Sequence, residues 1–183
     1  SSDLTAECGS YFALTHCVNG WQEEVADITV TGGDIHTKKE CVLVKSHNMM
    51  LDLCDVNISS DKGILVHTIV NDDPCATKVT KDVFGVNVVM TDMDVKGDLL
   101  HEDTTREMWV MLNSTQLTGA IQHANVAFDK GSKWVATADS DVVFVTDVEP
   151  AQIDAPAGVT ITAKGAQAGE FVLASGGKLV VTA

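Results

Sequence analysis

The chain of 183 residues contains a single arginine, Arg106, and 12 basic residues against 26 acidic ones. A protein that binds nucleic acid needs a basic surface and usually arginine side chains that grip phosphate. The net charge of −14 provides neither, and it also disfavours association with anionic membrane surfaces. Nucleic acid is therefore not an expected partner.

Long hydrophobic runs are also missing, since no apolar stretch approaches the roughly 20 residues that cross a membrane. Insertion into a membrane is therefore not expected. Aromatic residues make up only 5% of the chain, although 45% of its residues are hydrophobic. The interior must then be built from Val, Ile, Leu, Met and Ala, which suit thin, stacked layers of β-strands. No signal peptide begins the chain, so it is either intracellular or has lost a leader.

The five cysteines are odd in number, irregularly spaced and without a Cys-x-x-Cys pair: Cys8, Cys17, Cys41, Cys54 and Cys75. This pattern disfavours a zinc site. Cys8 and Cys17 could close a small loop in a secreted protein, or the cysteines could be small buried residues in reduced form. The disulfide pairing stays open.

Three segments of the chain align residue for residue and begin at Leu51, Val88 and Val110. Each has apolar residues at its first, third and last positions, and a pair of small, polar or acidic residues follows the third. Self-similarity of this kind indicates stacked units that bury their apolar faces against their neighbours. The step from Val88 to Val110 is 22 residues, a normal length for one turn of a parallel β-solenoid.

The other steps between equivalent segments differ in length. The step from Leu51 to Val88 is 37 residues, which predicts an insertion of about 15 residues near the polar turn at 71–74. The step from Val110 to Val126 is the shortest of the three, which predicts a shortened coil that ends at Trp134.

Alternation within each segment predicts which side chains face outward. The first and third residues point inward, so Trp109 faces outward, whereas Trp134 falls in the core. A glycine corner recurs in 96–99 and 118–121, and 32–35 has the pattern of an earlier copy. Equivalent residues are expected at two outward positions: Asp55, Asp92 and Ser114 at the first, and Asn57, Asp94 and Gln116 at the second.

Part of the chain resembles right-handed β-helix repeat proteins of the bacterial cell surface. Residues 113–121 resemble their coil of a small polar residue followed by Leu-Thr-Gly-Ala-Ile, and 126–140 resemble their Asp-x-x-Ser-x-Trp-x-x-Thr coil. Residues 173–179 are similar to their closing coil. The resemblance covers roughly 28–183 and implies a pectin-lyase-like solenoid with an adhesin-like role, secreted or on the cell surface. The cysteines and residues 1–27 depart from it, and the family has no settled active site to carry over.

We therefore expect an all-β fold, a single-stranded right-handed parallel β-helix of about six to eight coils. Residues 28–183 would form this domain, and 1–27 would cap or cover its end. Helical patterns are weak, with 19–26 the candidate for a short helix, and 157–183 should form closing coils.

The expected role is that of a non-catalytic, adhesin-like module that interacts with carbohydrate or with a surface protein, and no cofactor is expected. The alternative is a carbohydrate-active enzyme, a polysaccharide hydrolase or lyase, on the same scaffold. A hydrolase needs paired carboxylates at catalytic separation, and a lyase needs a cation to neutralise its acidic substrate. An enzyme should show a groove with converging acids, whereas a binding module should show scattered acids on a smooth surface. We predict scattered acids.

The candidate ligand-binding residues are Trp109, Asp92, Asp94, His101 and His123. Trp109 could hold a sugar ring or pack under a loop. Asp92 and Asp94 could offer oxygen ligands to calcium, but hydrated turns are the expected use of such acids. His101 and His123 are one coil length apart and could stack on one face, and the register of a third histidine, His67, is left unclear by the insertion.

Overall fold

The computed structural model describes residues 5–8, 10–16, 24–71 and 84–183, with side chains from residue 10 onward. Within these ranges the regular structure is β-strand, apart from one short 3-10 helix, η1 (Pro150–Gln152). The named strands that pair run parallel in these ranges, except for β19 and β20. The all-β prediction, with a large parallel sheet, is confirmed.

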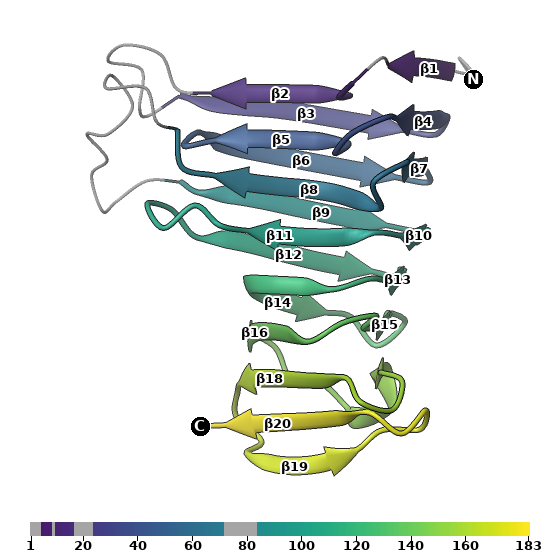
Figure 1. The fold of residues 1–183 in the computed structure, drawn as a ribbon, viewed down its shortest axis with the longest axis vertical. Coiled ribbons are helices and arrows are strands. Elements are labelled where there is room, and N and C mark those ends of the chain that lie inside the picture. The colour runs from purple at the N-terminus through teal and green to yellow at the C-terminus, as the bar shows by residue number, and fades with distance from the viewer. Residues whose placement is uncertain (1–4, 9, 17–23, 72–83) are drawn as a thin grey trace.

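One sheet, the front sheet, runs the length of the molecule (Figure 1). In spatial order it contains β2 (Ala13–His16), β5 (Val42–Lys45), β8 (Ile64–Ile69), β11 (Asp98–His101), β14 (Ile121–Phe128), β16 (Ser140–Phe144), β18 (Thr160–Lys164), β20 (Lys178–Thr182) and β19 (Gly169–Val172). A back row joins it through β14 and contains β3 (Val25–Thr31), β6 (Asn48–Cys54), β9 (Val86–Thr91) and β12 (Met108–Asn113).

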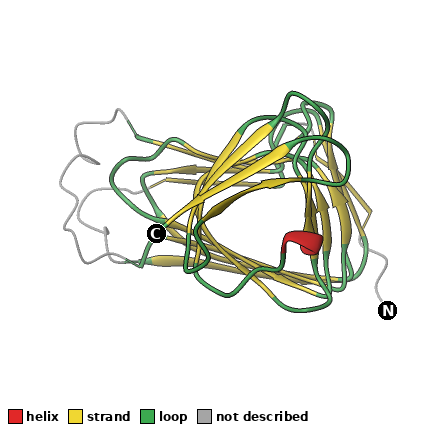
Figure 2. Cartoon of the chain, turned by 90° about the horizontal axis from the view of Figure 1, so that it is seen from below, coloured by secondary structure: helices red, strands yellow, loops and turns green. Residues whose placement is uncertain are grey.

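The third side is formed by two short sheets, together called the margin. The first contains β1 (Thr5–Cys8), β4 (Asp34–Thr37) and β7 (Asn57–Ser60). The second contains β10 (Asp94–Lys96), β13 (Gln116–Thr118), β15 (Lys133–Val135) and β17 (Ile153–Asp154). Seen along the stack, the strands nearly enclose the interior (Figure 2). This arrangement is compatible with a β-helix.

The strand register confirms the alignment of the repeated segments. Leu51 pairs with Val88, Val88 pairs with Val110, and Val110 pairs with Val126. Each of the three unequal steps in the sequence therefore carries the chain from one strand to its parallel neighbour. The first step contains the extra residues between β8 and β9, and 72–83 of that interval lie outside the described residues.

The interior is a column of aliphatic side chains that stack from strand to strand. Leu53, Met90 and Leu112 lie in register with one another and are each at most 1% exposed. Burying each such side chain contributes roughly 1.5–3 kcal/mol of hydrophobic free energy. Trp134 lies in register with Leu117, is fully buried, and donates from Nε1 to Gly119 O at 2.8 Å. Its predicted place in the core is confirmed.

The corner between the back row and the margin uses left-handed backbone. Asp55, Asp92 and Ser114 have φ values of 53°, 54° and 48°, and Gly32 has the same hand at 71°. Small polar residues and glycine tolerate this conformation better than others do. The predicted stacking of Asp55, Asp92 and Ser114 at one corner is confirmed. The assignment of 32–35 to the other glycine corner is wrong, because Ile35 pairs with Ile58, which follows the Asp55 corner.

Both ends of the chain differ from a simple stack. At the C-terminal end β19 folds back antiparallel to β20, so the edge strand of the sheet does not continue the parallel stack. At the other end, the candidate helix at 19–26 lies partly outside the described residues, and 25–26 begin β3 instead. The predicted boundary between residues 27 and 28 falls inside β3. A capping role for 1–27 stays a prediction.

Cys41 and Cys54 carry free thiols. Burial raises the pKa of the Cys41 thiol, although Thr37 donates a hydrogen bond to its sulfur, so Cys41 acts as a small buried residue. Cys17, Cys75 and the side chain of Cys8 lie outside the described residues, and with them any loop between Cys8 and Cys17.

Candidate functional site

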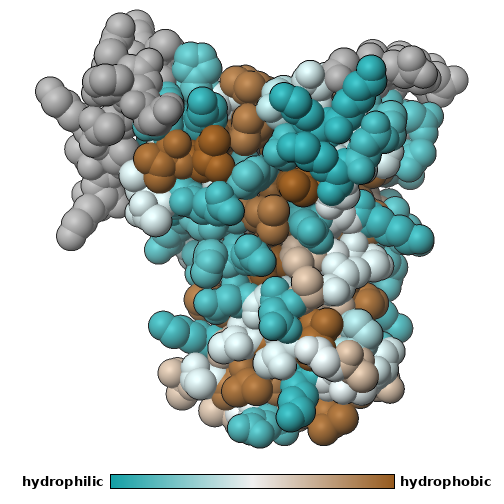
Figure 3. Space-filling model, in the orientation of Figure 1, coloured by the Kyte–Doolittle hydropathy of each residue, from teal (hydrophilic) through white to brown (hydrophobic). Residues whose placement is uncertain are grey.

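A cleft of about 630 Å³ lies beside the loop 102–107, which joins β11 to β12. The loop forms one wall, and residues of β14, β16 and β18 form the other. The outline of the molecule steps inward below this loop (Figure 3). The hypothesis of a binding module expected a smooth surface. The cleft shows that the surface is not smooth. Concave sites of this size are the usual places where proteins hold small ligands.

The cleft exists because one coil is shorter than the coil before it. Leu100 pairs with Gln122 on the front sheet, and Trp109 of the back row pairs with Asn125. The preceding coil therefore uses nine residues to pass between these two positions, whereas β14 uses only three. The shorter step to Val126 thus lacks the residues that form the loop 102–107 in the preceding coil. His123 makes the tight passage possible by adopting a left-handed backbone with φ of 57°. The loop has no counterpart below it, and the space is left open.

His101 holds the loop from inside and is only 7% exposed. Its Nε2 faces the Arg106 carbonyl oxygen at 2.9 Å, and because a carbonyl only accepts, Nε2 carries the proton. Its Nδ1 then accepts from the Thr68 hydroxyl. Burial lowers the pKa of His101, which keeps the imidazole neutral. Both ring nitrogens are engaged, so the structure places His101 in the cleft wall as a structural residue.

The one arginine of the chain is buried behind the same loop. Arg106 donates from Nε to Asn48 Oδ1 at 3.2 Å and from Nη1 to Thr105 Oγ1 at 3.0 Å. Its Nη1 lies 3.9 Å from Asp103 Oδ2, and neither side chain of this pair is exposed. The network ties the loop to β6 and gives the cleft a fixed wall.

Four carboxylates line the cleft: Glu102, Asp103, Glu107 and Asp141. Three of them have a polar neighbour at long range. Glu102 lies 3.3 Å from His67 Nε2, Glu107 accepts from Asn125 Nδ2 at 3.5 Å, and Asp141 lies 3.7 Å from His123 Nδ1. Contacts of this length are weak, so these carboxylates keep most of their capacity to accept hydrogen bonds from a ligand.

His67 does not join His101 and His123 as a third member, because Thr68 is the residue in register with His101. It lies on the outer side of β8 between Glu40 and Glu102, at 3.5 Å and 3.3 Å. Burial opposes ionisation of Glu40, but hydrogen bonds from its own backbone, from Lys62 and from His67 outweigh burial and lower the pKa of its carboxyl. This cluster links neighbouring coils on the front sheet.

Trp109 lies on the back row beside the cleft and is 39% exposed, as its parity predicted. It is flanked in register by Asn87 on β9 and Asn125 on β14. The same outward row continues through Val143 to Lys164. Asn125, Val143 and Lys164 also line the cleft. We call this row, from Asn87 to Lys164, the outer ladder. It leads from the exposed tryptophan directly into the cleft.

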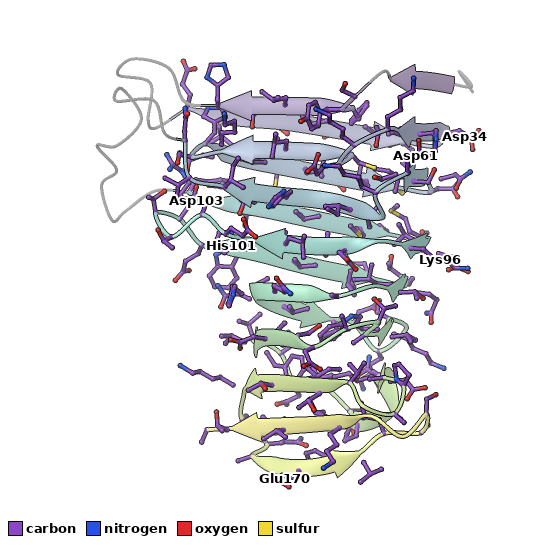
Figure 4. The ribbon with its side chains drawn as sticks, viewed as in Figure 1. Asp34, Asp61, Lys96, His101, Asp103 and Glu170 are labelled. Carbon is purple, nitrogen blue, oxygen red and sulfur yellow. The ribbon has the colours of Figure 1, made fainter. Side chains whose placement is uncertain are left out.

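Asp92 and Asp94 lie elsewhere, at the margin corner. With Asp34 and Asp55 they line a shallow recess of about 350 Å³. Figure 4 shows Asp34 at the margin of the molecule opposite to His101 and Asp103. Across the part of the chain that the structure describes, no three acids, histidines or cysteines gather closely enough to hold a metal ion. The acids are thus divided between opposite sides of the stack.

The sequence identified Trp109, His101 and His123 as candidate residues. It did not show that all three lie in or beside one cleft. A signal for the outer ladder was present, because Asn87, Trp109 and Asn125 follow one another at the same steps as the core positions Val88, Val110 and Val126. No signal of this kind marked Glu102, Asp103 or Glu107, which lie in a loop outside the repeat.

Compared with known proteins, the chain matches no protein-family model, no curated protein and no solved structure. Its resemblance to β-helix repeat proteins of the cell surface therefore stays a prediction from the sequence. Over the described ranges, no helix has the length and apolar character needed to cross a membrane.

Proposed function

We propose that this protein is a right-handed, single-stranded parallel β-helix that binds carbohydrate on its outer ladder without catalysis. The parallel register of equivalent residues supports this fold, as does the strong preference of parallel strands for right-handed connections. A secreted or surface-displayed, adhesin-like role agrees with the resemblance of its coils and with its acidic composition.

The single observation that carries the proposal is an exposed tryptophan between two in-register amides. An indole ring offers a large, rigid apolar face at little cost in conformational entropy. The Asn87 Nδ2 donates to Phe84 O at 3.2 Å and the Asn125 Nδ2 contacts Glu107, which leaves both Oδ1 atoms as acceptors for sugar hydroxyls. A pyranose that stacks on Trp109 would find hydrogen-bonding groups on both sides.

The spacing of the ladder also suits an extended sugar chain. Neighbouring strands lie about 4.8 Å apart, which is close to the length of one pyranose unit in an extended oligosaccharide. A chain laid along the stack would therefore meet one ladder residue with each sugar unit.

A glycan array probed with the wild-type protein and two variants tests this proposal. Trp109→Ala should weaken binding on the order of 30-fold, as expected for a central aromatic anchor. Val172→Ala is the matched control, because Val172 is 80% exposed at the far end of the stack. It should leave binding unchanged. Absence of binding by the wild type, or equal binding by Trp109→Ala, would contradict the proposal.

A carbohydrate-active enzyme is the second candidate, and the four carboxylates of the cleft favour it. Hydrolases place two carboxyl groups about 5–9.5 Å apart around the scissile bond. An assay for reducing ends released from the glycans that bind separates the two functions. We expect no release. Release that is lost in Glu107→Gln or Asp141→Asn would establish the enzyme instead.

A further inference from the structure

We propose that the cleft selects glycans that carry a positively charged amine, so that the preferred ligand is a de-N-acetylated amino-sugar chain. This inference rests on the proposed function, because it assigns the ligand class of the same ladder. It is based on the charged and polar side chains that line the cleft where the outer ladder reaches it.

The outer ladder connects Trp109, the proposed stacking surface for a sugar, to the cleft. Trp109 lies outside the cleft, whereas the next ladder residue, Asn125, lines it. A sugar unit next to the one stacked on Trp109 would therefore sit in the mouth of the cleft. Glu107 is also there, since its carboxylate contacts the Asn125 amide.

The side chains around the mouth of the cleft determine its charge. Glu107 and Asp141 lie on opposite walls, the first on the loop side and the second on β16. Glu102 and Asp141 have side chains that are 61% and 63% exposed, so they are free to turn toward a ligand. The lysine and arginine side chains in the lining are Lys164, three rungs or about 14 Å from Trp109, and Arg106, which is buried. His123 also lines the cleft, and its Nδ1 lies 3.7 Å from Asp141. The mouth of the cleft thus presents acids.

One carboxylate in the same wall, that of Asp103, is buried. The Asp103 side chain is 0% exposed and lines the cleft. Its Oδ1 accepts from Thr105, whereas its Oδ2 accepts no hydrogen bond from any described residue and lies 3.9 Å from Arg106. The adjacent guanidinium of Arg106 offsets the charge of Asp103, so the net negative charge of the cleft comes from Glu102, Glu107 and Asp141.

An amine suits the rest of the site as well. An ammonium group beside Trp109 gains a cation–π interaction with the indole face, which an acetylated amide does not. A uronic acid would instead meet the three exposed carboxylates of the cleft, Glu102, Glu107 and Asp141, and the net charge of −14. The site therefore favours amino sugars, accepts neutral sugars more weakly and rejects uronates.

Calorimetric titration with three oligomers of equal length tests this inference: glucosamine, N-acetylglucosamine and galacturonate oligomers. At low ionic strength and a pH at which the sugar amines are protonated, the glucosamine oligomer should bind on the order of tenfold more tightly than its acetylated counterpart. The preference should shrink as the Debye length falls from about 30 Å at 0.01 M salt to about 3 Å at 1 M. The galacturonate oligomer should not bind.

The double variant Glu107→Gln, Asp141→Asn should lose most of the preference for the glucosamine oligomer over the acetylated one, and the part that remains is supplied by Trp109 and Glu102. Asp94→Asn removes one acid at the opposite margin and is the control that should keep the full preference. Lys164→Gln should strengthen binding of the glucosamine oligomer.

The outcomes separate this inference from the proposed function. Binding of the acetylated oligomer as tightly as the glucosamine oligomer would overturn the amine selectivity but leave the glycan-binding role intact. Failure of the wild type to bind either amino-sugar oligomer would overturn this inference, and the glycan array then decides the proposed function on its own.

Discussion

The two halves of the stack secure their corners in different ways. In the N-terminal half, residues 24–113, the corner residues between the back row and the margin use their backbone. Gly32, Asp55 and Asp92 donate their N–H groups to Cys54 O, Thr91 O and Asn113 O of the next coil.

In the C-terminal half, residues 114–183, carboxylates do this work. Asp129 accepts from Ser114 N at 3.0 Å, and Asp154 accepts from Ser175 N at 2.9 Å. The side-chain hydrogen bonds from Ser132 and Ser175, with backbone N–H groups, lower the pKa of Asp129 and Asp154. The corners after β3, β6 and β9 thus use backbone hydrogen bonds, whereas these corners of the C-terminal half use carboxylate side chains. The cleft lies where the N-terminal and C-terminal halves of the stack meet.

The largest expected difference between the halves lies in the core. Trp134→Ala should reduce the free energy of unfolding by about 3–5 kcal/mol, because it removes a fully buried indole and its hydrogen bond. Val95 belongs to the same ladder of core residues in the N-terminal half, and Val95→Ala should cost about 2 kcal/mol. Urea unfolding measures both. Equal losses would show that the aromatic residue has no special weight in the short coils.

Acid should loosen the N-terminal half first. Burial lowers the pKa of His47 and of His101, so the unfolded chain takes up these protons more readily than the folded chain. Stability is then unaffected above about pH 6.5 and falls below it. The lowered pKa values of Asp129 and Asp154 act later, because their contribution is complete above about pH 4 and is lost as the pH falls through the folded values.

Hydrogen exchange at a series of pH values can follow the two halves separately. Between about pH 6.5 and pH 4.5, protection should fall around β8, β11 and β12 but hold around β16 and β18. His101→Gln should flatten this first phase. Loss of protection that begins in the C-terminal half would contradict the assignment.

The same substitution should have unequal effects at two different corners of the stack. Asp154→Asn weakens hydrogen bonds from Ser175 and Ala155, and it should cost about 1 kcal/mol after solvent screening is allowed for. Asp55→Asn leaves a backbone hydrogen bond to Thr91 intact and should cost less than about 0.5 kcal/mol. Thermal unfolding at neutral pH compares them, and a reversed order would refute the distinction between the halves.

The smallest effect is expected at the left-handed corner itself. Asp92→Gly places at this corner the residue that Gly32 already provides in an earlier coil, so relief of strain and the added chain entropy should nearly cancel. We expect a change within about 0.5 kcal/mol in chemical denaturation. A loss several times larger than this would mean that the Asp92 side chain holds the corner.

The sequence predicted the parts of this structure that repeat. Equivalent apolar residues revealed the register, because each must face the interior at the same place in every coil, and the corner of Asp55, Asp92 and Ser114 followed from it. The short step to Val126 was also visible. Its consequence, an open cleft beside a loop with no counterpart, depends on two coils meeting in space and could not be derived from one segment.

Other features left no periodic signal. Arg106 counts as a charge in the composition, and its burial follows from a loop whose network joins Asn48, Asp103 and Thr105. The strand β19 has an ordinary strand pattern, which does not distinguish parallel from antiparallel pairing. His67 was ambiguous because the insertion separates it from His101, and only the register showed that Thr68 takes the inward place.

The central claim is that equivalent residues stack in parallel register, and a nuclear Overhauser measurement between side-chain methyl groups tests it most directly. Met90 lies between Leu53 and Leu112, its partners in the neighbouring strands. The account predicts strong contacts from the Met90 methyl group to both leucines. A Met90 methyl group that contacts neither of them would contradict the stacked fold, and with it the outer ladder and the cleft.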